Sequence, residues 1–215
     1  ACSGFVYGLD VGSRLAEAGA TVLLVGAETL TRYVDPDDRS IAVLFGDGAG
    51  AVVLGARTGA ELGPFDLGSD GSDVPMLWMR SGGSREPFDP VAHAEPSSRI
   101  GMRGGDVYRH AVARMTASSE AVLAAAGRTV ADVDLLVGHQ ANLRILTAVA
   151  ERLGIPEDRC HVSVDRHGNT SAASIPLALA DARAQGRLRP GMRLLLTAFG
   201  GGLTWASCLM TWEGR

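Results

Sequence analysis

The chain has 215 residues, of which 46% are apolar and 28 are glycines, a length that suits one large or two small α/β domains. Its formal charge of -4 is small and scattered without a basic run, so nucleic-acid binding has no support. No apolar run reaches membrane-spanning length. The separated cysteines Cys2, Cys160 and Cys208 indicate neither a disulfide framework nor a zinc site. These features predict a globular protein of the reducing cytoplasm.

The first segment, ACSGFVYGLDVGSRLAEAG, predicts a helix with Cys2 in its first turn. Because the chain opens at Ala1 rather than at an initiator Met, we expect another segment to precede it. Free cysteines are usually small buried side chains, which is the expectation for Cys160 and Cys208. Cys2 differs, because the unpaired N–H groups at a helix start favour a thiolate, which is a nucleophile.

The next segments alternate apolar runs with glycines and polar loops. The run TVLLVGAE from Thr21 predicts a buried strand of a parallel sheet that is covered on both faces. From Ile41, IAVLFGDGAGAVVLGAR predicts two strands joined by glycines, and its GDGAG is no phosphate loop because a strand rather than a helix follows. The region from Glu61 to Gly105 predicts strands and exposed loops with surface and partner contacts.

Regular spacing returns at Asp106. The segment VYRHAVARMTASSEAVLAAAG predicts a helix ended by Gly127, VDLLVGHQ predicts a short buried strand ending at His139, and ANLRILTAVAERLG predicts another helix. His139 therefore lies where a strand gives way to a helix, which is where α/β sheets bind their ligands. A purely structural role for a lone histidine there stays open.

The segment VDRHGNTSAASIP, residues 164–176, has the strongest features of a site. His161 to Val164 alternate like a strand, a turn follows, and a helix is predicted from Thr170. Asn169 lies at or beside the helix N-cap, and its side chain suits a simple capping role. Beyond capping, Gly168 and the small residues 171–174 allow another element to come close, and Pro176 is expected to break the first turns of the helix.

Two segments of the chain share a pattern of strand, glycine turn and strand. LFGDGAGAVVL and AFGGGLTWASCLM align with Phe45 and Phe199 in register. The match predicts two similar α/β halves, residues 1–105 and 106–215, although any β-hairpin produces a similar pattern.

Cys2, His139 and Asn169 together supply a nucleophile, a base or acid, and a neutral hydrogen-bond donor, a set that suits acyl transfer through a thioester. Five motifs resemble, in order and spacing, those of beta-ketoacyl-acyl carrier protein synthase III, the condensing enzyme that starts fatty acid and some polyketide chains. They are ACSGF, LFGDGAGAVV, GHQANLRI, DRHGNTSAASIP and AFGGGLTW. The resemblance covers nearly the whole chain and implies the thiolase fold, a layered αβαβα sandwich of two similar halves, of which the first is incomplete here.

The resemblance also implies the reaction, a decarboxylative Claisen condensation of an acyl-coenzyme A starter with malonyl-acyl carrier protein through an acyl-Cys2 intermediate. His139 and Asn169 would donate hydrogen bonds to the malonyl thioester, and the backbone N–H groups of Cys2 and Gly201 would hold the oxyanion. The reaction requires no metal or redox cofactor. The family resemblance further implies a homodimer.

Weaker carry-overs concern binding. Asn142 and Arg39 match positions along the coenzyme A path, Gly104 matches one near the acyl pocket, and Arg144 matches a carrier-protein contact; for both arginines a solvated surface role fits equally. Two departures matter: the long segment that this family has before its nucleophile is absent, and Arg103 stands where a small residue is expected. The starter group therefore stays open, as do two alternative functions, an acyltransferase without decarboxylation and a non-catalytic thiolase-like subunit.

Overall fold

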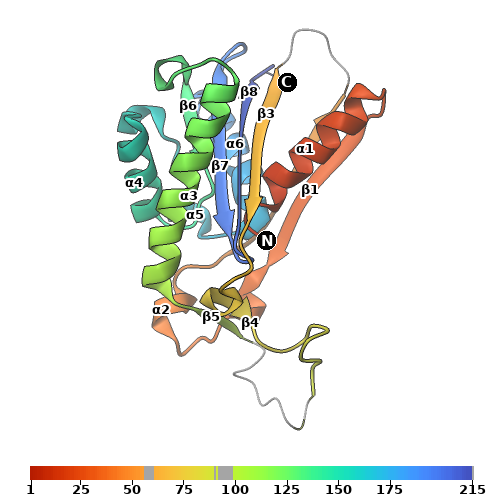
Figure 1. Ribbon diagram of the computed structural model, residues 1–215, viewed down its shortest axis with the longest axis vertical. Helices are drawn as coiled ribbons and strands as arrows, with labels where there is room; N and C mark the ends of the chain where they lie inside the picture. Colours follow the sequence, from red (N-terminus) through yellow and green to blue (C-terminus); the bar gives the residue numbers. More distant parts are fainter. Residues whose placement is uncertain (56–60, 90, 92–98, 215) are drawn as a thin grey trace.

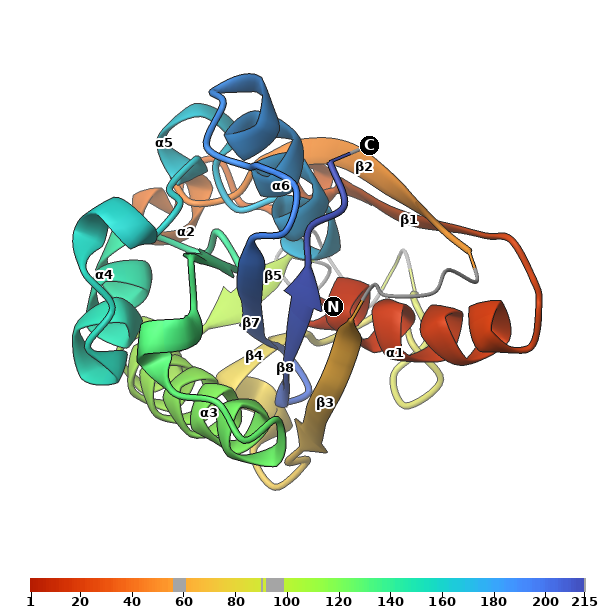
Figure 2. The ribbon, with the colours of Figure 1, turned by 90° about the horizontal axis from the view of Figure 1, so that it is seen from above.

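The computed structural model describes residues 1–55, 61–89, 91 and 99–214. The helices of this part are α1 (Gly4–Glu17), α2 (Arg39–Ala42), α3 (Gly104–Ala125), α4 (Leu143–Leu153), α5 (Val164–His167) and α6 (Ser174–Ala184). The strands are β1 (Val22–Thr29), β2 (Asp47–Leu54), β3 (Leu62–Ser69), β4 (Leu77–Met79), β5 (Ile100–Met102), β6 (Leu135–Gly138), β7 (Arg193–Gly200) and β8 (Thr204–Thr211). Figures 1 and 2 show these elements as successive layers of helices, sheet, helices and sheet.

The larger sheet has the strand order β3-β8-β7-β6. β6 and β7 are parallel, whereas β8 is antiparallel to both β7 and β3. Every residue of β6 is buried, and in β7 only Arg193 is not, as near-continuous apolar runs predict. The hairpin of β7 and β8 confirms the strand, glycine turn and strand expected around AFGGG.

Helices cover the larger sheet on both faces. On one face, α3 and α4 contribute residues such as Met115 and Leu146 to a core that includes Leu195 of β7. On the other face, α1 and α6 contribute Phe5 and Ile175 to a second core. The two cores fix β7 between two helical layers, and its carboxyl end is therefore held rigidly.

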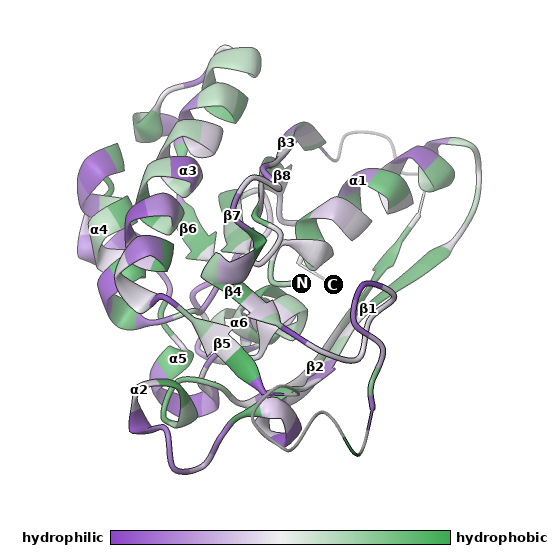
Figure 3. Ribbon diagram, turned by 60° about the horizontal axis from the view of Figure 1, so that its bottom comes forward, coloured by the Kyte–Doolittle hydropathy of each residue, from purple (hydrophilic) through white to green (hydrophobic). Residues whose placement is uncertain are grey.

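The smaller sheet, β1 with β2, packs on the far side of α1 and α6. Its strands are antiparallel, and their side chains alternate between a face that packs on the helices and an exposed face. On the exposed face, Leu23 is 66%, Val25 53% and Val53 68% exposed, and Figure 3 shows apolar residues along both strands. The prediction of a parallel strand covered on both faces is wrong for β1, because no described residue covers its outer face.

One other prediction fails in the first half of the chain. Ile41 to Phe45 do not form a strand, because the Asp38 carboxylate accepts a hydrogen bond from Ser40 N–H and begins the short helix α2. The strands predicted between Glu61 and Gly105 are present as β3, β4 and β5, and β3 pairs with β8 in the larger sheet. Residues 56–60, 90 and 92–98, which include the end of the predicted strand AVVLGAR, lie outside the described residues.

The second half follows the sequence more closely. α3 ends before Gly127, whose φ is +62°, and β6 and α4 lie where the spacing predicts them. The division into two similar halves stays a prediction. None of the described helices is both long and apolar enough to cross a membrane.

Candidate active site

Cys2 lies in the turn just before Ser3, the N-cap of α1, rather than inside the first helical turn as predicted. It is buried, and its neighbour across the site is Gly200 at the end of β7. A Cβ on Gly200 would lie 2.8 Å from Cys2 Cβ and 2.9 Å from Cys2 N. Only glycine therefore fits beside the cysteine, and the triple glycine of AFGGG was the signal for this contact, although the sequence analysis named Gly201 alone.

The Cys2 thiol is protonated in the resting site. Burial raises its pKa, and the Ser171 hydroxyl offsets this effect only in part, while the Glu28 carboxylate adds to it. The expectation that the helix start favours a thiolate is therefore wrong for this state, because desolvation outweighs it.

His139 follows β6 directly, and its backbone N–H donates to Thr197 O of β7 at 2.8 Å. Its imidazole is 2% exposed, with Nδ1 2.6 Å from the Ser174 hydroxyl oxygen. Burial lowers the pKa of His139 to about 3. The imidazole is therefore neutral at physiological pH, and the described residues form no hydrogen bond to its Nε2.

The buried Gln140 side chain links two segments by hydrogen bonds, a role that its place in the HQAN motif did not predict. We call this set of bonds the Gln140 clamp. The amide nitrogen of Gln140 donates to Gly138 O at 2.8 Å and to His161 O at 3.2 Å. Its amide oxygen accepts from Ser163 N at 2.8 Å and from Val164 N at 3.1 Å. Residues 161–164 are consequently not the predicted strand, because a side chain takes the N–H groups that a ladder would need. The clamp ties the end of β6 to the chain that leads to Asn169.

Asn169 is 8% exposed and is fixed by the segment before β2. Its N–H donates to Leu44 O at 2.8 Å, and its carbonyl accepts from Gly46 N at 2.9 Å. Its side-chain Oδ1 accepts from Ser171 N at 2.9 Å, so Asn169 lies beside Thr170, the N-cap of a 3₁₀ turn, and does not cap the α-helix, whose N-cap is Ala173. This bond orients the amide, so Nδ2 becomes a donor for which the described residues provide no acceptor.

The turn around Asn169 permits the predicted close approach. Gly168 has φ +65°, and a Cβ there would lie 3.2 Å from Leu44 O. On the following segment, Ala172 O lies 2.6 Å from the position of a Cβ on Gly26 of β1. The small residues therefore let the segment lie directly on the smaller sheet.

The helix after this turn begins later than predicted. Ser171–Ala173 form a 3₁₀ turn, and α6 starts at Ser174. Pro176 is the third residue of α6 and does not break the helix, because N–H groups in the first turn lack helical partners in any case.

Two elements bring Cys2, His139 and Asn169 to one place. The strand β7 bonds the His139 backbone and also touches Cys2. The segment 169–174 contains Asn169, a serine whose hydroxyl lies beside the Cys2 thiol, and a serine bonded to His139. The structure thus gathers these three side chains, and their catalytic roles stay predictions.

Gly201 directly follows Gly200 beside Cys2, whereas the other predicted residues make contacts elsewhere. Asn142 caps α4, with Oδ1 accepting from Ile145 N at 2.9 Å. Arg39 is exposed at the first position of α2. A Cβ on Gly201 would lie 3.0 Å from Leu77 O, so this position also favours glycine.

The residues near the predicted acyl and carrier-protein contacts are at the surface. Gly104 is exposed at the start of α3, and the neighbouring Arg103 forms ion pairs with Asp73 and Asp106. The exposed guanidinium of Arg144 lies 5.6 Å from the ring centre of Tyr108.

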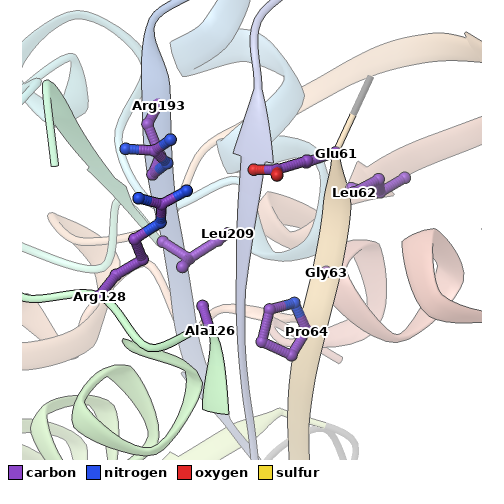
Figure 4. Close-up of a pocket in the computed structure, with 8 residues that line it drawn as sticks. All are labelled: Glu61, Leu62, Gly63, Pro64, Ala126, Arg128, Arg193 and Leu209. Atoms are coloured by element: carbon purple, nitrogen blue, oxygen red, sulfur yellow. The ribbon is translucent and has the colours of Figure 1, made fainter. Parts of the chain in front are cut away.

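A hollow of about 290 Å³ lies elsewhere, at the opposite end of β7 (Figure 4). Its walls include Arg193, Arg128 and Glu61 but none of the three gathered side chains. It is not part of the candidate active site. The described residues contain no group of three or more His, Cys, Asp or Glu side chains able to hold a metal ion.

Comparison with known proteins agrees with this fold. Residues 1–71 match the family model described as 3-oxoacyl-[acyl-carrier-protein (ACP)] synthase III, and residues 123–212 match the model of its C-terminal part. The chain is 52% identical, over 98% of its length, to beta-ketoacyl-[acyl-carrier-protein] synthase III 3 of Streptomyces coelicolor, and it spans 64% of that relative. It is 50% identical over 98% of its length to a synthase III of Nitratidesulfovibrio vulgaris, again spanning 64% of the relative.

Solved structures give the same result. A beta-ketoacyl-[acyl carrier protein] synthase III from Thermus thermophilus superposes with a TM-score of 0.90 at 45% identity, over 100% of this chain and 66% of the other. The priming beta-ketosynthase of the R1128 polyketide pathway superposes with a TM-score of 0.87 at 37% identity, over 100% and 64%. The layered fold is that of the thiolase-like condensing enzymes. The chain belongs to the 3-oxoacyl-[acyl-carrier-protein] synthase III family.

Proposed function

We propose that the protein is an acyltransferase that condenses an acyl-coenzyme A starter with malonyl-acyl carrier protein and so begins fatty acid or polyketide synthesis. The observation that carries the proposal is a pair of neutral nitrogen groups beside a buried cysteine. His139 Nε2 and Asn169 Nδ2 each lack a hydrogen-bond partner among the described residues. Such groups suit donors to a thioester oxygen.

In the first half-reaction, Cys2 receives the acyl group. Its sulfur attacks the carbonyl carbon of acyl-coenzyme A, the carbon–sulfur bond to coenzyme A breaks, and the thiol proton ends on the coenzyme A sulfur. The backbone N–H groups of Cys2 and Gly201 stabilise the oxyanion. Because Gly200 has no side chain, the strand end comes close enough for such an arrangement.

In the second half-reaction, malonyl-acyl carrier protein loses carbon dioxide. The electron pair of the broken carbon–carbon bond passes into an enolate, whose oxygen accepts hydrogen bonds from His139 and Asn169. The enolate carbon attacks the acyl-Cys2 carbonyl, and Cys2 leaves as a thiolate that takes up a proton. Since decarboxylation supplies the carbanion, this route uses no metal or redox cofactor.

The remaining residues suit binding. The Asn142 side chain has its oxygen engaged in the cap, which leaves its nitrogen for coenzyme A, and Arg39 presents its charge to the same phosphate-rich ligand. Gly104 leaves room near the acyl chain. Arg144, held over Tyr108, offers a cation to an acidic carrier protein. The working form is proposed to be a cytoplasmic homodimer.

Malonyl-carrier protein labelled at its free carboxyl group provides the test. Incubation of the purified protein with this substrate and a short acyl-coenzyme A is expected to release labelled carbon dioxide and to form a β-ketoacyl-carrier protein. Acyl transfer to another acceptor without release would favour the non-decarboxylating acyltransferase. Neither product would favour the non-catalytic subunit.

A further inference from the structure

The Ser174 hydroxyl is the one group of the described chain that bonds the His139 imidazole. Its oxygen lies 2.6 Å from Nδ1, and both side chains are 2% exposed. Ser174 is the first residue of α6, whose packed inner face holds it in place. Water has little access to this contact, so the two groups must satisfy one another.

The hydrogen atoms of this contact can be assigned by counting donors and acceptors. The backbone N–H of Gln140 donates to Ser174 Oγ at 3.3 Å, which engages one lone pair of the hydroxyl. A hydroxyl has a single hydrogen to donate, and His139 Nδ1 is its only acceptor among the described residues. The hydroxyl therefore donates to Nδ1. In a neutral imidazole, the ring proton must then be on Nε2.

We propose that Ser174 is a positioning residue that holds His139 in the tautomer protonated at Nε2, so that this nitrogen donates to the malonyl thioester oxygen. The inference rests on the proposed condensation and adds a residue and a proton position to it. In the opposite tautomer, Nε2 would present a lone pair to the enolate oxygen and repel it. Ser174 thus selects the tautomer that stabilises the negative charge.

The same assignment separates the two half-reactions. An Nε2 that already carries a proton cannot accept one from the Cys2 thiol. Loading of Cys2, in which the thiol proton passes to coenzyme A, therefore does not depend on this tautomer. Loss of the Ser174 hydroxyl should impair condensation and leave loading nearly intact.

Nuclear magnetic resonance of protein labelled with ¹⁵N-histidine tests the proton position directly. The two ring nitrogens of a neutral histidine have distinct chemical shifts, and the His139 signals can be assigned by their loss in a His139→Asn variant. The unsubstituted protein is expected to show His139 protonated at Nε2, Ser174→Thr to keep that state, and Ser174→Ala to lose it. Protonation at Nδ1 in the unsubstituted protein, or an unchanged tautomer in Ser174→Ala, would overturn the proposal.

Kinetics supply the second readout. Ser174→Ala is expected to lower kcat for condensation by roughly ten- to a hundredfold, the usual effect of removing a group that orients a functional histidine, with KM little changed. Ser174→Thr should restore most of the rate. The matched control is Ser119→Ala, which removes an equally buried hydroxyl that has no hydrogen-bond partner among the described residues. An equal loss in the control, or no rescue by threonine, would count against a positioning role.

The two levels of inference fail separately. If the unsubstituted protein released no carbon dioxide from malonyl-carrier protein, the proposed function would fail while the tautomer measurement stood. If carbon dioxide were released and the Ser174→Ala rate were unchanged, the positioning role alone would fail.

Discussion

The two sheets contain similar apolar runs, yet their surroundings differ. LLLTAF in β7 is buried on both faces, between α3 and α4 on one side and α1 and α6 on the other. VLLV in β1 is covered on one face only, with Leu23 and Val25 exposed. Residue type alone therefore did not decide burial. The neighbouring layers determine how much of each strand is buried. In β1, which pairs with β2, only alternate residues face the helices.

The sheets also contribute differently to the candidate site. The larger sheet presents strand ends, which hold His139 and contact Cys2. The smaller sheet contributes glycines to the face on which the Asn169 segment packs. Gly26 and Gly50 are paired across the two strands, and Gly48 lies nearby. Cβ atoms on these glycines would lie 2.6 to 2.8 Å from Ala172, Pro176 or Leu177. The GDGAG motif thus serves close packing of the Asn169 segment.

The largest effect is expected at Cys2, which directly precedes α1, the helix that packs between the two sheets. Cys2→Ala should abolish acyl loading, because no other described cysteine can replace it. Burial raises the pKa of all three thiols, but only Cys2 lies beside Gly200 and Ser171 in the candidate site, whereas Cys208 lies inside β8 and Cys160 lies next to β6. Mass spectrometry after incubation with a short acyl-coenzyme A should place the added mass on Cys2. Acylation of Cys160 or Cys208 with Cys2 unmodified would contradict the assignment.

Asn169 tests the contribution of the segment that the smaller sheet supports. Asn169→Ala should keep much of the loading of Cys2 but lower condensation by at least about a hundredfold, the usual cost of one oxyanion donor. His139→Ala should behave similarly. Single-turnover loading and the release of labelled carbon dioxide measure the two steps separately. If Asn169→Ala lost loading and kept decarboxylation, Asn169 would be only a cap for the turn.

Much of the second half could be predicted, because its signals are local. Gly127 marks the end of α3, and Asn142 and Gly154 frame α4. Contacts distant in the sequence were not predictable in this way. Nothing in residues 161–164 indicates that Gln140 will take their N–H groups, and nothing near Leu62 indicates pairing with β8.

The same limit applies to the candidate site. Cys2, His139 and Asn169 stand in motifs, so their residue types and positions predicted chemistry before the fold was known. Their protonation did not follow from position. The resting Cys2 is a thiol, because burial outweighs the helix start. The sequence predicts only a helical position for Ser174, and the structure places its Oγ 2.6 Å from His139 Nδ1.

A pair of glycine substitutions compares the two sheets directly. Gly200→Ala would press a methyl group against Cys2, whereas Gly26→Ala would press one against Ala172 O. Each overpacking is expected to cost about 1–3 kcal/mol. Gly200→Ala should slow loading by about tenfold, and Gly26→Ala should slow condensation by about tenfold with loading less affected, because a shift of the reacting groups that adds about 1.4 kcal/mol to the activation free energy lowers a rate by one decade. Gly71→Ala, with open space around the added carbon, is the control. Equal effects of both substitutions on both steps would contradict separate contributions of the sheets.

The effect that is smallest at neutral pH concerns the pH dependence of stability, which should arise on the side of the larger sheet. The pKa of His139 falls to about 3 on folding, and burial lowers that of His161 as well. Below about pH 6.5 the His139 imidazole binds a proton in the unfolded chain but stays neutral in the folded protein, so acid favours unfolding. The free energy of unfolding should fall by about 1.4 kcal/mol per pH unit for each such histidine, from about pH 6.5 down to the folded pKa.

Urea unfolding at several pH values measures this slope, and His139→Asn should reduce it. His167→Asn, at an exposed position of α5, should leave the slope unchanged. An unaltered slope in His139→Asn would mean that the folded protein takes up a proton at His139 as readily as the unfolded chain does, and the neutral donor assigned to the site would be lost.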